Sequence, residues 1–274
     1  MSRIEARFEG LKRDGRKALI PFITAGDPDP GVTVPLMHEM VIAGADLIEL
    51  GVPFSDPMAD GPVIQKANQR ALKHHVSLRD VLAMVATFRE LDNDTPVLLM
   101  GYLNPIEAMG YEEVADSCDE AGVDGLLIVD MPPEEAGDFN EQLYRHNVDP
   151  VYLLAPTSTD ERMELVTKAA RGFVYYVAIR GVTGAAELNY DEINQSINAI
   201  RKHGSLPVGV GFGINGPDSA VKIGKNADAV IIGSAIVNRV EESKDNPDAI
   251  LSNIGNFLRE VRHALDGMSE KERA

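Results

Sequence analysis

Residues 44–62 read Gly-Ala-Asp-Leu-Ile-Glu-Leu-Gly-Val-Pro-Phe-Ser-Asp-Pro-Met-Ala-Asp-Gly-Pro, which is the most informative stretch of the chain. A short apolar run bounded by glycine predicts a strand that is buried on both faces, as in a parallel sheet. Glu49 lies within this run, and Asp56 and Asp60 lie in the Pro- and Gly-rich loop that follows. A buried strand that ends in such a loop is typical of an α/β protein, whose sites lie beyond the carboxyl ends of the strands.

Glu49 is the residue of this stretch that most strongly suggests chemistry. An ionised carboxylate is costly inside an apolar strand unless a cation or hydrogen-bond donors accompany it, and the other apolar runs contain no Lys or Arg. Desolvation raises the pKa of such a carboxyl group, and perturbed pKa values of this kind are found in acid–base catalysts. A structural Glu bonded to backbone amides or to a Tyr hydroxyl is the alternative.

Further apolar runs recur along the chain, with amphipathic segments between them. The expected strands are Ala18–Ala25, Asp46–Gly51, Pro96–Gly101, Gly125–Asp130, Pro150–Ala155, Phe173–Ile179, Pro207–Gly211 and Asp228–Gly233. The expected helices between them include Tyr111–Ala121, Glu134–His146, Asp160–Ala170 and Tyr190–His203. This alternation predicts parallel strands joined by right-handed crossovers. Eight such units in about 250 residues predict a (β/α)₈ TIM barrel; a doubly wound open sheet is the alternative.

The whole chain, residues 1–274, is expected to form a single TIM-barrel domain. Residues 1–16 contain a charged, helix-like segment that would cap the bottom of the barrel as an extra N-terminal helix. An apolar stripe of helical period over residues 250–265 predicts a last helix. The charged tail from about residue 267 to residue 274 is expected to be frayed.

The composition argues against several classes of protein. Lys and Arg total 26 against 43 Asp and Glu, so the net charge of −17 would repel a nucleic acid. No apolar run approaches the roughly 18 residues that cross a bilayer, and the first residues lack the apolar core of a signal peptide. The single Cys118 excludes an internal disulfide and suits a reducing compartment. We therefore expect a cytoplasmic protein with neither a nucleic-acid nor a membrane partner.

Glycine-rich turns follow the last three barrel strands. They are Gly181-Val-Thr-Gly184, Gly209-Val-Gly-Phe-Gly213 and Gly233-Ser234. Glycine lets backbone amides approach an anion closely, and a helix N-terminus adds a favourable dipole. In barrels of this class the last two strands commonly supply a phosphate site. The pattern therefore favours a phosphate site built from main-chain N–H groups, with tight turns that bind nothing as the alternative.

Taken together, these motifs resemble the alpha subunit family of tryptophan synthase from end to end. The matching segments are Pro21–Pro28, Glu49–Pro62 with Gln65, Met100–Pro105, Asp130–Glu135, Gly181–Gly184, Gly211–Gly213 and Gly233–Ala235. The resemblance implies a TIM-barrel lyase that cleaves indole-3-glycerol phosphate to indole and glyceraldehyde 3-phosphate. It also implies a partner, a pyridoxal-phosphate beta subunit in an alpha2-beta2 heterotetramer, which receives the indole and makes tryptophan. The chain itself would carry no cofactor and no metal.

The resemblance also implies roles for individual residues. Glu49 would carry the proton transfers of a retro-aldol cleavage, and Asp60 would accept the indole N–H and stabilise the charge of the ring. The indole slot would consist of Phe22, Leu127 and Phe212, with Tyr175 packed near the substrate and holding Glu49. The phosphate ligands would be Gly184, Gly213, Gly233 and Ser234. Thr183 would lie in a loop that closes over the site and contacts Asp60.

Two other functions remain open at this point. A free-standing lyase that releases indole needs the same pair of carboxyl groups, and a non-catalytic barrel could activate a pyridoxal-phosphate enzyme. Docking of a partner would occur on the catalytic face, where we expect Met58, Ile106 and Met131 to be exposed.

Overall fold

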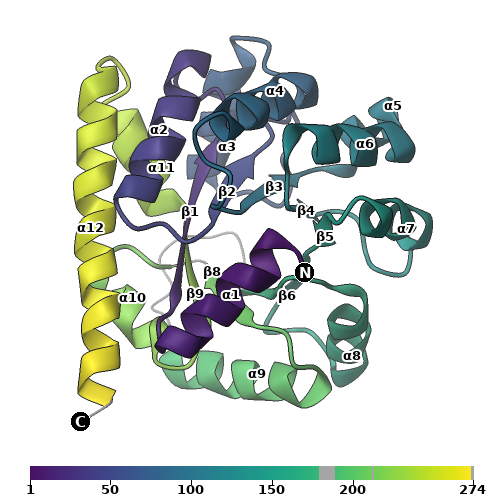
Figure 1. Ribbon diagram of the computed structural model, residues 1–274, viewed down its shortest axis with the longest axis vertical. Coiled ribbons are helices and arrows are strands. Elements are labelled where there is room, and N and C mark those ends of the chain that lie inside the picture. The colour runs from purple at the N-terminus through teal and green to yellow at the C-terminus, as the bar shows by residue number, and fades with distance from the viewer. Residues whose placement is uncertain (179–188, 212, 273–274) are drawn as a thin grey trace.

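The computed structural model describes the chain except for residues 179–188, 212 and 273–274, and shows strands surrounded by helices (Figure 1). The strands within the described residues are β1 Ala18–Thr24, β2 Ile48–Gly51, β3 Val97–Gly101, β4 Gly125–Ile128, β5 Asp149–Pro150, β6 Tyr152–Leu154, β7 Val174–Val177, β8 Val208–Gly211 and β9 Ala229–Ile232. The helices are α1 Arg3–Asp14, α2 Pro30–Ile42, α3 Pro62–Leu72, α4 Leu78–Arg89, α5 Leu103–Met109, α6 Tyr111–Ala121, α7 Gly137–Arg145, α8 Asp160–Ala169, α9 Tyr190–His203, α10 Pro217–Gly224, α11 Ser234–Glu242 and α12 Pro247–Glu272.

The strands form one parallel sheet in the order β5-β4-β3-β2-β1-β9-β8-β7-β6. Its two end strands, β5 and β6, are separated only by Val151, so the sheet returns on itself as a barrel. The N–H of Val151 donates to the backbone oxygen of Leu126 in β4 at 2.8 Å, whereas Tyr152 pairs with Val174 of β7. Together β5 and β6 therefore act as the fifth barrel strand. The TIM-barrel prediction is confirmed, and the open-sheet alternative is wrong.

Successive side chains of each strand face opposite sides of the barrel wall. Ile20 and Leu98 belong to the cluster inside the barrel, whereas Leu19 and Leu99 belong to the larger cluster between the strands and the helices. Because both faces are buried, the strands read as continuous apolar runs in the sequence. This explains why all eight barrel strands could be found from their composition.

Helix α1 covers the end of the barrel at which the strands begin (Figure 1). Ser2 caps the helix, and Ile4, Phe8 and Leu11 are buried against the inner cluster. This helix lies within residues 1–16, where the sequence indicates a cap. Apolar side chains of α1 therefore close the barrel end opposite the carboxyl ends of the strands.

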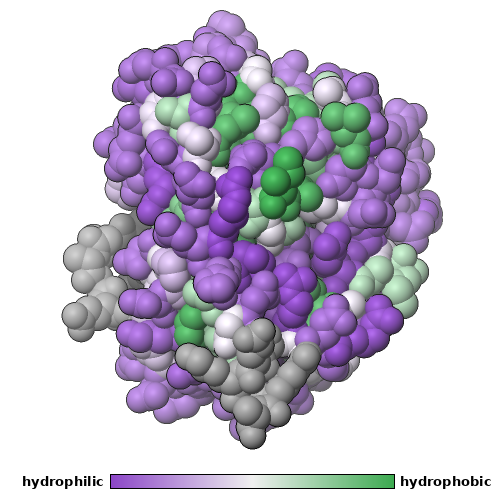
Figure 2. Space-filling view, turned by 60° about the vertical axis from the view of Figure 1, so that its left-hand side comes forward, coloured by the Kyte–Doolittle hydropathy of each residue, from purple (hydrophilic) through white to green (hydrophobic). Residues whose placement is uncertain are grey.

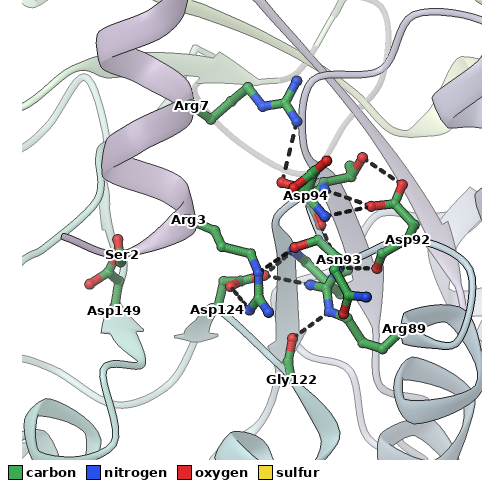
Figure 3. Close-up of polar contacts among 12 residues, drawn as sticks. Ser2, Arg3, Arg7, Arg89, Asp92, Asn93, Asp94, Gly122, Asp124 and Asp149 are labelled. Atoms are coloured by element: carbon green, nitrogen blue, oxygen red, sulfur yellow. Dashed lines mark hydrogen bonds and ion pairs between the residues drawn. The ribbon is translucent and has the colours of Figure 1, made fainter.

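A network of charged groups fixes α1 to the strands below it. Figure 3 shows Arg3 of α1 and Arg89 of α4 pointing toward the carboxylate of Asp124, which they contact at 2.8 and 2.6 Å. The side chains of Arg89 and Asp124 are only 8% and 4% exposed. The N–H of Val97 also donates to Asp124, at 2.8 Å. This buried ion pair thus connects α1, α4 and the start of β3.

The long C-terminal helix α12 packs against α2 and α10 at one side of the molecule (Figure 1). Its backbone is helical as far as Glu272, and Met268 is buried beside Gly224 of α10. Helix α12 therefore continues past residue 267, and Met268 makes an apolar contact there. Figure 2 shows that hydrophilic side chains cover most of this side of the molecule, with only small, separate hydrophobic groups. Within the described residues, no helix has the length and apolarity needed to cross a membrane.

Candidate active site

Glu49 lies on β2 in the interior of the barrel, between two apolar neighbours. In the sheet register it pairs with Phe22 of β1 on one side and with Leu98 of β3 on the other. Glu49 is 1% exposed, and among the described residues neither of its carboxylate oxygens has a hydrogen-bond partner. The alternative of a structural Glu bonded to backbone amides or to a Tyr hydroxyl is therefore wrong for the described part of the chain.

The pKa of Glu49 is strongly raised by this environment. Burial is the main cause, and the negative charge of Asp60 is the second; together they raise the pKa from 4.5 to about 8. An isolated carboxyl group in an apolar site keeps its proton because its charged form is poorly solvated. At neutral pH Glu49 is therefore a carboxylic acid that can donate a proton.

Asp60 is also buried, but it has hydrogen-bond partners. The Nδ2 atom of Asn68 donates to its Oδ2 at 3.2 Å, and the hydroxyl of Tyr102 also bonds to its carboxylate. Burial raises the pKa of Asp60 to about 6, and the bonds from Tyr102 and Asn68 limit that rise. At neutral pH Asp60 is therefore mostly ionised, in contrast to Glu49 beside it.

The contacts of Tyr102 and Asn68 with Asp60 were not expected from the sequence. The hydroxyl of Tyr102 accepts the N–H of Ala59 at 3.1 Å, and its ring stacks on Phe54 with a centroid distance of 5.0 Å. Asn68 is buried on α3, and its helical spacing from apolar neighbours is the signal that could have identified it. Tyr102 comes from a segment 43 residues away, so no local pattern marks its contact with Ala59.

The structure brings Phe22, Leu127 and Tyr175 into the barrel interior from β1, β4 and β7. The charges of Glu49 and Asp60, together with burial as the larger cause, raise the pKa of Tyr175 well above its ordinary value. Tyr175 therefore lies near both carboxyl groups. It does not donate a hydrogen bond to Glu49, so the expectation that it holds Glu49 is wrong; its hydroxyl instead packs over Gly211.

Of the glycines expected to bind phosphate, Gly213 and Gly233 lie after β8 and β9. Gly213 has a φ of +75°, which glycine adopts readily, and Gly233 precedes Ser234 at the start of α11. Among the described residues no side chain caps the first turn of α11, whereas Ser219 accepts the N–H groups of Asn215 and Gly216 just before α10. Gly233 also faces Phe22, which is the register partner of Glu49. The N-terminus of α11 therefore faces the same barrel mouth.

Three predicted site residues lie outside the described part of the chain: Thr183, Gly184 and Phe212. The expectation of an exposed apolar face is correct only for Met58, which is 79% exposed. Ile106 and Met131 are 3% and 5% exposed, because both pack into the core between the strands and the helices. Within the described residues no group of His, Cys, Asp and Glu is arranged to bind a metal ion.

A family model, curated proteins and solved structures all place the chain in one family. The family model described as tryptophan synthase alpha chain matches residues 8–266. The chain is 60% identical to the tryptophan synthase alpha chain of Thioalkalivibrio sulfidiphilus (strain HL-EbGR7) over 97% of its own length and 100% of that protein. It is 56% identical to that of Alkalilimnicola ehrlichii (strain ATCC BAA-1101 / DSM 17681 / MLHE-1), over 99% of each chain. The crystal structure of tryptophan synthase subunit alpha from Legionella pneumophila str. Paris matches with a TM-score of 0.91 and 44% identity, over 97% of this chain and 99% of that one.

Proposed function

The chain belongs to the tryptophan synthase alpha chain family, and we propose that it cleaves indole-3-glycerol phosphate to indole and glyceraldehyde 3-phosphate by acid–base catalysis. The observation that carries this proposal is the pair of buried carboxyl groups in different protonation states. Glu49, with a pKa of about 8, holds a proton at neutral pH, whereas Asp60, with a pKa of about 6, has lost its own. Two neighbouring acids with separated pKa values can act as acid and as anion in one site.

In the proposed reaction Glu49 donates its proton to carbon 3 of the indole ring, and positive charge develops on the ring nitrogen. Asp60 accepts a hydrogen bond from the ring N–H and stabilises that charge. The Glu49 carboxylate then takes the proton of the hydroxyl on the adjacent side-chain carbon. The carbon–carbon bond breaks, its electron pair returns to the ring, and the aldehyde forms. Glu49 has regained its proton at the end, so the cycle needs no external base.

The remaining residues of the site bind the two ends of this substrate. Phe22, Leu127 and Tyr175 supply an apolar wall for a planar ring. Gly213, Gly233 and Ser234 supply main-chain N–H groups for the phosphate, together with the dipole of α11. Phe212, Thr183 and Gly184 complete the proposal as a fourth ring contact, a loop hydroxyl and a further phosphate ligand. Such main-chain donors would attract the phosphate locally, although the chain as a whole is acidic, with a net charge of −17.

We further propose that the chain works with a pyridoxal-phosphate beta subunit that takes up the indole, in an alpha2-beta2 assembly in the cytoplasm. The relatives are named as alpha chains, which supports a complex with another subunit. The chemistry proposed above needs no cofactor in this chain, so the proposal assigns pyridoxal phosphate to the partner.

The proposal is tested by following indole formation from indole-3-glycerol phosphate. The chain contains no Trp, so indole fluorescence can be recorded without a tryptophan background. We expect the wild-type chain to form indole and Glu49→Gln to lose at least about a thousandfold in kcat, since an amide cannot transfer the proton. Asn140→Leu, which changes a buried polar residue of α7, is the control and should retain activity. Turnover by Glu49→Gln close to that of the wild type would refute the proposed role.

A further inference from the structure

Helix α3 begins just after Asp60 and contacts that residue twice. The Nε2 atom of Gln65 donates to the backbone oxygen of Asp60 at 2.8 Å, and Nδ2 of Asn68 donates to its Oδ2 at 3.2 Å. Gln65 and Asn68 are three residues apart, so they lie on the same face of the helix. Asn68 is only 4% exposed. The helix that follows Asp60 thus fixes both its main chain and its carboxylate.

Other contacts hold α3 itself in place. Arg70 donates twice to the carboxylate of Asp27, at 2.6 and 2.9 Å, and lies 3.3 Å from Glu241 of α11. Asp27 is 5% exposed, so this ion pair is largely shielded from water. On the barrel side, Ala67 is buried in a cluster with Phe22. Because α3 is attached to two neighbouring segments, Asn68 is a rigid support for Asp60.

The groups that face Asp60 from the other elements do not include a cation among the described residues. Tyr102, at the corner between β3 and α5, bonds to the carboxylate. Glu49 of β2 and Tyr175 of β7 both experience the charge of Asp60. Glu49 becomes a second negative charge when it ionises. The only donors to the carboxylate within the described chain are therefore the hydroxyl of Tyr102 and the amide of Asn68.

We propose that Asn68 is a positioning residue, whose amide directs the carboxylate of Asp60 and keeps it as an acceptor for the ring N–H of the substrate. This inference rests on the proposed function, because it assigns Asn68 a task in that reaction. A carboxylate can accept the ring N–H while Asn68 binds its Oδ2, since its two oxygens together offer about four lone-pair sites. Burial raises the pKa of Asp60, and the hydrogen bond from Asn68 opposes that rise. Without the amide of Asn68, the pKa of Asp60 should therefore be higher.

The test compares the pH dependence of kcat/KM for indole formation by the full-length wild type, Asn68→Asp and Asn68→Leu. For the wild type we expect activity to rise as Asp60 loses its proton near pH 6 and to fall as Glu49 loses its proton near pH 8. In Asn68→Leu the carboxylate of Asp60 loses a hydrogen bond. The lower limb of the profile, which is the rise of kcat/KM on the acid side, should therefore move upward by about one pH unit. In Asn68→Asp two carboxyl groups share one site, so the shift should be larger. The upper limb should move less than the lower limb in both variants.

Asn140→Leu is the matched control, because Asn140 is also buried and accepts a hydrogen bond from Tyr152 at 2.9 Å, far from Asp60 in the fold. It should leave both limbs in place, whereas a loss of folded protein would lower the whole curve without moving a limb. If the lower limb of folded Asn68→Asp does not move, the inference is overturned. Because Asp has almost the shape of Asn, this variant still gives a result if Asn68→Leu does not fold. If the wild type forms no indole at any pH, the proposed function has failed; if it does and the limb is unmoved, only the role of Asn68 has failed.

Discussion

At the scale of single residues, the site depends on two carboxyl groups whose surroundings give them different charges. Glu49 has apolar neighbours and no hydrogen-bond partner among the described residues, whereas Asp60 accepts bonds from Asn68 and Tyr102. Desolvation favours the protonated form of Glu49, whereas the hydrogen bonds to Asp60 favour its ionised form. The functional difference between two chemically similar side chains thus follows from what each one contacts.

The raised pKa of Glu49 predicts a pH-dependent cost to stability. The folded chain holds this proton up to about pH 8, whereas in the unfolded chain the group ionises near 4.5. Its contribution to stability is therefore fully present below pH 4.5 and is lost as the pH rises through about 8. Glu49→Gln should become more stable relative to the wild type over this range, by on the order of 4 kcal/mol.

This difference is measured as the free energy of unfolding of both proteins in urea at several pH values. A difference that does not change between pH 5 and pH 9 would contradict the assignment of a buried, protonated Glu49.

Sequence patterns predicted the candidate site only where the pattern is local. Glu49 could be recognised because a carboxyl group in an apolar run is unusual, and Asp60 because its loop follows directly. The role of Tyr102 depends on a contact with a segment 43 residues away, which no local pattern encodes. The expectation that Tyr175 bonds to Glu49 was wrong, since sharing the barrel interior does not fix the direction of a hydroxyl.

At the scale of helices and strands, the buried ion pair of Arg89 and Asp124 connects elements at the end of the barrel where the strands begin (Figure 3). Asp124→Ala would leave the guanidinium of Arg89 buried without its counter-ion and remove an acceptor for Arg3. We expect a loss of about 3–5 kcal/mol in the free energy of unfolding. Denaturation in urea measures this loss.

The matched control is Arg79→Ala, which breaks an ion pair with Glu113 whose side chains are 65% and 51% exposed. That change should cost less than about 1 kcal/mol, because exposed pairs contribute little. Equal effects of Asp124→Ala and Arg79→Ala would show that burial of the pair is not what matters.

The extents of the elements were predictable to different degrees. Helices α6 and α9 have the expected limits, Tyr111–Ala121 and Tyr190–His203. The interruption of the fifth barrel strand at Val151 was not expected, because it depends on where pairing passes from β4 to β7. The continuation of α12 past residue 267 was also missed, since the charged tail hides the contact that Met268 makes.

At the scale of the whole molecule, the predicted docking surface consisted of Met58, Ile106 and Met131. Of these three residues, only Met58 is exposed. Burial of such a side chain in an interface is worth about 1.5–3 kcal/mol. We therefore expect Met58→Ser to weaken binding to a tryptophan synthase beta subunit by about tenfold or more. Leu91, which is 83% exposed and precedes β3 at the other end of the barrel, provides the control Leu91→Ser.

Titration calorimetry with a purified beta subunit gives both affinities. Leu91→Ser should bind like the wild type, and an equal loss for both variants would place the docking surface elsewhere.

The proposed chemistry requires that Glu49 carry a proton at neutral pH. Carboxyl carbon NMR of the chain labelled at the Glu side chains, with Glu49→Gln to assign the signal, measures that state as a function of pH. We predict that Glu49 is a neutral acid at pH 7 and titrates near pH 8. A Glu49 signal that shows a carboxylate at pH 7, with a midpoint near 4.5, would contradict the proposed chemistry.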